Sequence, residues 1–143
     1  MPRWIPAVLL LAACGEGGLD TLSITDTDVE VDVEGPVITH EPIQDPQVYG
    51  NDVLIEATVD DDSGVFTVQV VYKHSTGGDG DWKSKVMNSV SSGFYQGRIL
   101  GKDHASSGIR YYIEAIDAIG NVGCLPDTDP CGQESWYFPL SAD

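Results

Sequence analysis

The sequence predicts an all-β fold, an antiparallel sandwich of seven strands that follows a disordered acidic linker. Between residues 36 and 140, short runs rich in β-branched and aromatic residues alternate with turn residues, at intervals of roughly ten positions. No window in this region shows the 3.6-residue apolar period of a helix. Sixteen glycines and eight prolines supply the turn residues that so many short strands require. We therefore expect residues 36–140 to form the folded domain.

The first three strands are expected at residues 36–40, 53–59 and 65–73. Alternation in the second of them places four apolar side chains on one face: Val53, Ile55, Ala57 and Val59. The third is rich in β-branched and aromatic residues, and the turn residues at 60–64 separate it from the second.

The remaining four strands are expected at residues 82–87, 94–100, 109–117 and 135–140. Gly97, inside one of them, indicates a bulge or a close approach of another part of the chain. The strand at 109–117 has the clearest alternation, which places four side chains on one face: Ile109, Tyr111, Ile113 and Ala115.

Residues 1–13 have the features of a secretory signal peptide. Arg3 precedes the apolar run 4–11, which is far shorter than the ~20 residues of a membrane-spanning helix. Two small residues and Cys14 follow, and hydrophobicity ends there. The run Leu11-Ala12-Ala13-Cys14 resembles the lipobox of bacterial lipoproteins. The alternative is an ordinary signal peptide with a cysteine close to its cleavage site.

The resemblance to lipoproteins implies cleavage before Cys14 and attachment of several acyl chains, such as palmitate, to that residue. One acyl chain gives only marginal membrane binding, whereas two or more give stable attachment. We therefore expect a lipid-anchored protein of the bacterial cell envelope, bound to the membrane through its N-terminal lipid. Gly15, where some family members have Asp, favours the outer membrane.

Residues 14–35 are expected to form an acidic linker. From residue 15 onward this segment has no basic residue and contains seven acids: Glu16, Asp20, Asp26, Asp28, Glu30, Asp32 and Glu34. Polar and apolar residues alternate from 25 to 34, but acids at every second position would repel one another along a free strand. A solvated linker is the simplest interpretation, and a stretch that binds divalent cations is the alternative.

The charge of the chain limits the classes of partner. It contains 23 acidic and 7 basic residues, with a formal net charge of −16. Nucleic-acid binding is not expected, because a phosphate backbone attracts basic surfaces. An envelope protein or a glycan is the expected partner.

Two motifs carry a resemblance to a known family of domains. The run ATVDDDSGV at 57–65 and the run YYIEAIDAIGN at 111–121 resemble those of bacterial immunoglobulin-like and fibronectin type III-like modules. The resemblance covers residues 36–140 and implies a seven-stranded sandwich that serves as a spacer, an adhesion unit or an accessory domain. The stretch 123–134 departs from the family, because it is longer than the usual tight hairpin.

Oxygen-bearing side chains follow two of the expected strands, and the resemblance places the two loops at the same end of the sandwich. These candidates are Asp60, Asp61, Asp62, Asp117 and Asn121. Such oxygens suit Ca²⁺, which takes six to eight oxygen ligands. The same residue types are also those that tight turns require. The sequence leaves both interpretations open.

Cys124 and Cys131 are expected to form a disulfide, because they lie close together in a chain that carries an export signal. The disulfide would stiffen the long loop, either to present a binding site or only to protect the loop from proteolysis. A zinc site is excluded for this pair, because no His or further Cys accompanies it.

Most aromatic residues are expected in the core, and Trp82, beside a glycine-rich loop, is the candidate for contact with a ligand such as a sugar. The aromatic residues considered are Trp82, Trp136, Tyr95, Tyr111, Tyr112, Tyr137, Phe94 and Phe138.

Catalysis is not expected. The His–Ser neighbours, His74 with Ser75 and His104 with Ser106, lie in polar loops without a nucleophile-elbow motif. The sequence thus predicts a non-enzymatic envelope lipoprotein that presents an interaction or structural module, without an obligatory cofactor. The alternatives are a Ca²⁺-dependent adhesin or carbohydrate-binding module, and an accessory subunit of an envelope enzyme.

Overall fold

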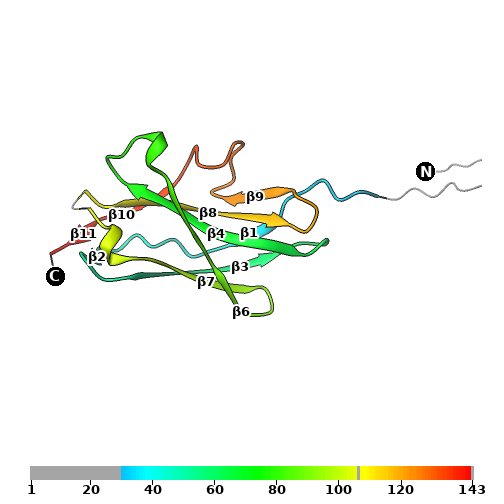
Figure 1. Ribbon diagram of the computed structural model, residues 1–143, viewed down its shortest axis with the longest axis horizontal. Helices are drawn as coiled ribbons and strands as arrows, with labels where there is room; N and C mark the ends of the chain where they lie inside the picture. Colours follow the sequence, from blue (N-terminus) through cyan, green and yellow to red (C-terminus); the bar gives the residue numbers. More distant parts are fainter. Residues whose placement is uncertain (1–29, 106, 143) are drawn as a thin grey trace, which may run out of the picture. The chain divides into compact units, whose positions relative to one another are not determined.

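The chain folds into two antiparallel β-sheets that face each other (Figure 1). This computed structural model describes residues 30–105 and 107–142. The first sheet has the strand order β1-β3-β7-β6. Its strands are β1 (Val37–Thr39), β3 (Val53–Asp60), β7 (Phe94–Ile99) and β6 (Asn88–Ser91). The predicted all-β antiparallel sandwich is confirmed.

The second sheet has the order β10-β8-β4-β5, and β9 also pairs with β8. Its strands are β10 (Trp136–Phe138), β8 (Ile109–Asp117), β4 (Val65–His74), β5 (Lys83–Val86) and β9 (Val122–Leu125). Two short strands, β2 (Gln47–Val48) and β11 (Leu140–Ser141), pair in parallel, and two 3₁₀ turns, η2 (Asp79–Asp81) and η3 (Gly101–Asp103), complete the described part.

The core lies between the sheets and is built from the alternation that the sequence shows. In β3 the predicted inward positions are at most 3% exposed, and those of β8 are completely buried. Phe138 from β10 and Ile99 from β7 are also completely buried. Burying one apolar face of each sheet removes large aliphatic and aromatic side chains from water, and this drives the two layers together.

The strand predicted at 82–87 is present as β5 (Lys83–Val86), but the sequence did not predict β6, which follows it in the other sheet. β5 pairs with β4 and ends at Val86, whereas β6 begins at Asn88 and pairs with β7. Met87, at the crossing point, is 3% exposed and packs over Gly97, where an added Cβ would lie 2.7 Å from the Met87 Cγ. The close approach predicted at Gly97 is therefore confirmed.

The stretch 123–134 is not a long hairpin loop, as the sequence suggested. β8 turns tightly into β9, whose residue Leu125 pairs with Ile113. Further along β8, Trp136 of β10 pairs with Tyr111. β9 and β10 thus act as one edge strand beside β8, and the residues between them are an insertion into that strand.

The compact unit that contains the sandwich begins at Asp32, four residues before the boundary expected from the sequence. Gly35 crosses the start of β9 at close range, since an added Cβ would lie 2.3 Å from the backbone of Val122. A Cβ on Gly123 would lie 2.2 Å from the carbonyl oxygen of Pro36. Two glycines without side chains therefore allow this close backbone crossing.

Candidate functional site

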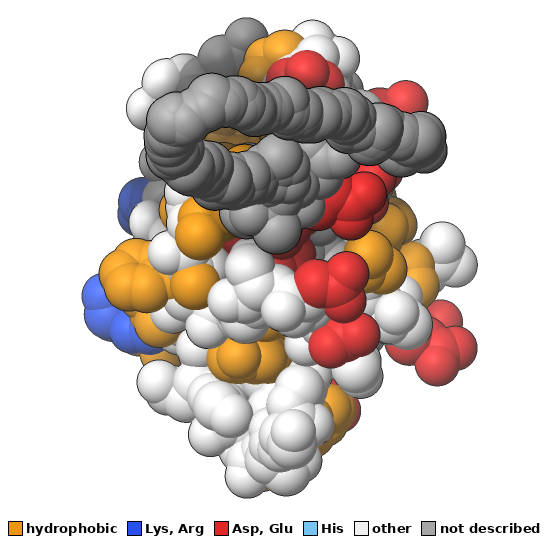
Figure 2. Space-filling view, turned by 90° about the vertical axis from the view of Figure 1, so that its right-hand side faces the viewer, with side chains coloured by type: hydrophobic (Ala, Val, Ile, Leu, Met, Phe, Trp, Pro, Cys, Tyr) orange, Lys and Arg blue, Asp and Glu red, His pale blue; other side chains and the backbone are white. Residues whose placement is uncertain are grey.

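The structure brings some of the predicted Ca²⁺ ligands together at one end of the sandwich. Asp61, Asp117 and Asp32 each place a carboxylate oxygen within 4.8 Å of the other two. We call these three residues the acidic trio. Asp60 and Asp62 are exposed and do not belong to this trio. Figure 2, which looks along the sandwich at one of its ends, shows acidic side chains beside apolar ones.

Asp117 is a structural cap of the turn from β8 to β9. It is 1% exposed, and its Oδ1 accepts hydrogen bonds from the backbone N–H groups of Ile119 at 2.9 Å and Asn121 at 2.8 Å. Its Oδ2 accepts one from the Asn121 side-chain amide at 2.9 Å. Burial raises the pKa of Asp117, but these hydrogen bonds outweigh burial and leave the pKa below its usual value. The carboxylate is therefore ionised at neutral pH.

The other two members of the trio share one hydroxyl group. Ser63 Oγ lies 2.7 Å from Asp61 Oδ1 and 2.9 Å from Asp32 Oδ2. Since a hydroxyl has one proton, it donates fully to only one of these two acceptors. Asn121 also donates its side-chain amide to the Asp32 backbone carbonyl at 3.0 Å, which holds this segment against the turn.

Sequence reasoning missed Asp32, because it assigned this residue to the linker. Nothing local in the sequence indicated that the chain crosses β9 at Gly35, close to the acidic trio.

Trp82 is half-buried at the edge of the second sheet. Its ring lies edge-on to Tyr112 with 5.1 Å between centroids, and Lys73 Nζ lies 4.6 Å from the centre of the Trp82 ring. The ring borders a groove of about 400 Å³ that Tyr72, His74, Lys83 and Asp103 also line.

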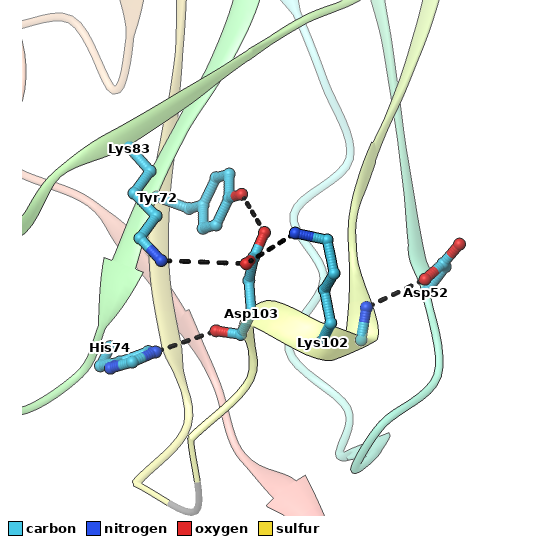
Figure 3. A network of polar contacts seen from close by, with 7 residues as sticks. Asp52, Tyr72, His74, Lys83, Lys102 and Asp103 are labelled. Carbon is cyan, nitrogen blue, oxygen red and sulfur yellow. Dashed lines mark hydrogen bonds and ion pairs between the residues drawn. The ribbon is translucent and has the colours of Figure 1, made fainter.

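Asp103, from η3, is the centre of the polar contacts in this groove (Figure 3). Its Oδ2 accepts a hydrogen bond from the Tyr72 hydroxyl at 2.7 Å, and its Oδ1 lies 3.8 Å from Lys83 Nζ and 3.5 Å from Lys102 Nζ. The Tyr72 hydrogen bond is the main cause of the lowered pKa of Asp103; burial opposes it, and the two ammonium groups add to it. Burial, followed by the contact with Asp103, raises the pKa of Tyr72. The groove thus has an ionised carboxylate held by a neutral phenol.

The predicted disulfide between Cys124 and Cys131 is present, with 5.9 Å between the Cα atoms. It closes the insertion between β9 and β10 and lies over the outer face of the second sheet. There Cys124 packs with Val71 and Tyr112, and Trp82 and Cys131 pack against them. The disulfide therefore belongs to a second, smaller apolar cluster outside the main core. A hollow of about 550 Å³ beside it includes Asp127 and Asp129.

Fewer aromatic residues lie in the core than the sequence predicted, because several are only partly buried. Tyr111 and Phe138 are completely buried, whereas Tyr137 is 41% exposed and has Arg110 over its ring at 5.5 Å. Trp136 is partly buried against Tyr111.

His74 and Ser75, the His–Ser pair that the structure describes, are not hydrogen-bonded to each other. His74 Nε2 lies 2.9 Å from the Asp103 carbonyl oxygen, and Ser75 Oγ donates to the Ser107 carbonyl. His104 Nδ1 accepts a hydrogen bond from the Gly50 N–H at 3.1 Å. Ser106 lies outside the described residues.

His104 is expected to make the domain sensitive to mild acid. The ring is 7% exposed, Nδ1 is occupied as an acceptor, and Nε2 has no hydrogen-bond partner among the described residues. Burial lowers the pKa of His104, and the neighbouring charges of Asp52 and Asp103 only partly oppose this. Protonation would break the bond from Gly50.

We expect the free energy of unfolding to fall as the pH is lowered from about 7.5 to about 5. The histidine pKa is near 6.5 in the unfolded chain and lower in the folded one, so the unfolded state binds more protons in this range. His104→Gln keeps an acceptor for Gly50 but does not titrate, so its urea midpoint should fall less. His40, whose pKa is also lowered mainly by burial, accounts for a remaining decrease. A wild-type midpoint that stays constant or rises on acidification would contradict this prediction.

Cys14 and the apolar run before it lie outside the described residues. Within the described part, no helix has the length and hydrophobicity needed to cross a bilayer. No protein-family model matches the chain, and no curated protein matches it significantly.

Proposed function

We propose that this chain is a non-enzymatic lipoprotein of the bacterial cell envelope, which presents an immunoglobulin-like sandwich as an interaction or structural module. The observation that carries the proposal is the run Leu11-Ala12-Ala13-Cys14 upstream of an acidic linker and a disulfide-containing sandwich. A disulfide is typical of compartments outside the cytosol, as an exported lipoprotein requires. The lipid would hold the module at the membrane, and the linker would give it reach.

The strand order supports the immunoglobulin-like assignment. Immunoglobulin-type sandwiches place the first, second, fifth and fourth strands in one sheet and the third, sixth and seventh in the other. The present strands follow that order if β9 and β10 are counted as one interrupted strand and β5 as an additional edge strand. The first sheet is then β1-β3-β7-β6, and the second is β10-β8-β4.

Replacement of Cys14 by serine tests the anchor. In a Gram-negative host, the wild-type chain is expected in the membrane fraction and should be labelled by a palmitate analogue. Cys14→Ser should remove the label and move the protein to the soluble fraction, because no other acylation site is proposed. Cys131→Ser is the matched control, since it removes a cysteine outside the lipobox and should leave the label unchanged. Membrane attachment of Cys14→Ser that equals wild type would refute the proposal.

A Ca²⁺-dependent adhesin is the second candidate function, and the acidic trio favours it. Three carboxylates this close repel one another unless hydrogen bonds or a cation offset their charge. The ion pairs of Lys83 and Lys102 go to Asp103, not to the trio. Carboxylate oxygens together with the Asn121 side chain are suitable ligands for Ca²⁺, which tolerates irregular geometry.

Calorimetric titration of the Cys14→Ser chain with CaCl₂ tests this candidate. Binding in the millimolar range or tighter is expected, together with a higher thermal midpoint, because a cation that binds only the folded state stabilises it. Asp61→Asn should weaken binding by about tenfold or more, since it removes one ligand charge. Asp62→Asn changes an exposed neighbour outside the trio and should have no effect. Equal affinity in the two variants, or no heat at millimolar Ca²⁺, would eliminate the adhesin.

A further inference from the structure

The groove beside Trp82 is assembled from three separate parts of the chain. Tyr72, Lys73 and His74 come from the end of β4, residues 80–83 come from the connection into β5, and Asp103 comes from η3. Residues that are distant in sequence therefore converge on one hollow of about 400 Å³ at the edge of the sandwich (Figure 3). Pockets with a few convergent polar groups on an apolar wall are typical ligand sites.

The apolar wall is the Trp82 indole, and its position is fixed before any ligand arrives. Tyr112 packs against it in a T-shaped arrangement, and Lys73, which is only 9% exposed, lies over the ring. An aromatic ring held in this way loses little conformational entropy when a ligand packs on its remaining exposed surface.

The polar side of the groove offers the Asp103 carboxylate as an acceptor and the Lys83 ammonium group as a donor. The Asp103 carboxylate lies 3.8 Å from Lys83 Nζ and 3.5 Å from Lys102 Nζ, which is longer than a direct hydrogen bond. A hydroxyl group on the open side of such a pair can bridge it, because it donates to the carboxylate and accepts from the ammonium group. Charge-assisted hydrogen bonds of this kind are stronger than neutral ones.

We propose that this groove binds a saccharide, with the apolar C–H face of one sugar ring on Trp82 and its hydroxyls bridging Asp103 and Lys83 from the open side of the groove. A purely apolar ligand would remove water from the charged groups without offering them a hydrogen bond in return. A simple anion would meet the carboxylates of Asp81 and Asp103, which line the same groove. A sugar ring satisfies both sides, because it carries C–H groups on a face and hydroxyls at its rim. The inference names a ligand class for the proposed interaction module, whereas the lipid anchor is tested separately through Cys14.

Two-dimensional NMR titration of ¹⁵N-labelled Cys14→Ser protein tests the inference with three soluble probes: chitohexaose, maltohexaose and a disaccharide muropeptide. At about 10 mM, at least one of them should shift the Trp82 indole signal and the backbone signals of Lys83 and Asp103, since a shallow groove is expected to bind in the millimolar range. No shift with any of the three probes would overturn the proposal. Shifts confined to the hollow beside Cys131 would also overturn it.

Variants separate ligand contact from folding. Trp82→Ala and Asp103→Asn should each weaken binding of the responding probe by about tenfold or more. Trp82→Phe keeps an aromatic face and should retain most of the affinity. This variant still tests the site if the Trp82→Ala chain fails to fold. Tyr137→Ala is the matched control, because Tyr137 is also an aromatic ring with a cation over it but lies outside the groove. Equal loss in Tyr137→Ala and Trp82→Ala would overturn the assignment of this groove.

Discussion

Replacement of Tyr111 by phenylalanine is expected to lower the free energy of unfolding by roughly 2–4 kcal/mol. The ring of Tyr111 is completely buried in β8, and its hydroxyl accepts a hydrogen bond from the Ile43 N–H at 2.9 Å. The same hydroxyl lies 2.8 Å from His40 Nε2. Loss of the oxygen leaves two partly buried groups unsatisfied while the ring still fills its place, so the cost comes from hydrogen bonding. Burial also raises the pKa of Tyr111 to about 12, so the phenol stays neutral across the accessible pH range.

Tyr112→Phe is the matched control, because the neighbouring ring points to the outer face of the same strand. No hydrogen bond of its hydroxyl is among those of the described residues, and the ring packs against Trp82. The free energy of unfolding of Tyr112→Phe should therefore be within about 0.5 kcal/mol of the wild-type value. Urea unfolding of both variants at neutral pH measures the difference. Equal destabilisation would show that the Tyr111 hydroxyl does not hold the segment around Ile43.

Alternation along β8 predicted correctly that Tyr111 points inward, but not what its hydroxyl touches. Side-chain direction in a strand follows from a two-residue period, which is local information. The partners His40 and Ile43 lie 71 and 68 positions away in the sequence, so only the packed fold brings them to the ring. Hence the core was predictable from the sequence, whereas its internal hydrogen bonds were not.

The strand boundaries show the same limit. β3, β4 and β8 are long and either alternate or are rich in β-branched and aromatic residues, and they lie within one residue of their predicted ends. The crossing at Met87 was not predicted, because β5 and β6 have short, exposed sequences in which no face is marked as apolar. A strand needs a buried face to specify its register, and these edge strands have none.

The candidate sites were predictable only in part. Turn chemistry marked Asp61, Asp117 and Asn121, which the structure brings together, but it also marked exposed residues that lie outside the trio. Asp103 was missed, because a single acid in a short loop carries no spacing signal. Its position opposite Tyr72 depends on where η3 packs against the end of β4, which is a property of the assembled sandwich.

Removal of the disulfide by the double substitution Cys124→Ala and Cys131→Ala is expected to lower the free energy of unfolding by about 2–3 kcal/mol. The bridge joins residues seven apart, and opening this loop gives the unfolded chain more conformations. Cys124 is also 8% exposed and packs with Val71 and Tyr112, so its truncation removes apolar contacts as well. Urea unfolding in the absence of reductant measures the loss.

Wild-type protein in the presence of reductant should be destabilised somewhat less than the double variant, because it keeps the apolar contacts of Cys124. Cys14→Ser should unfold like wild type, since Cys14 lies outside the pair. Unchanged stability in both the double variant and the reduced protein would contradict the prediction.

Loss of the disulfide should also affect the proposed saccharide groove, because Trp82 packs against the cluster that holds Cys124. A looser cluster would leave the indole less fixed, so the double variant should bind the responding saccharide more weakly while Asp103 and its partners remain in place. Such a loss would identify the disulfide as a support for ligand binding in addition to its role in stability.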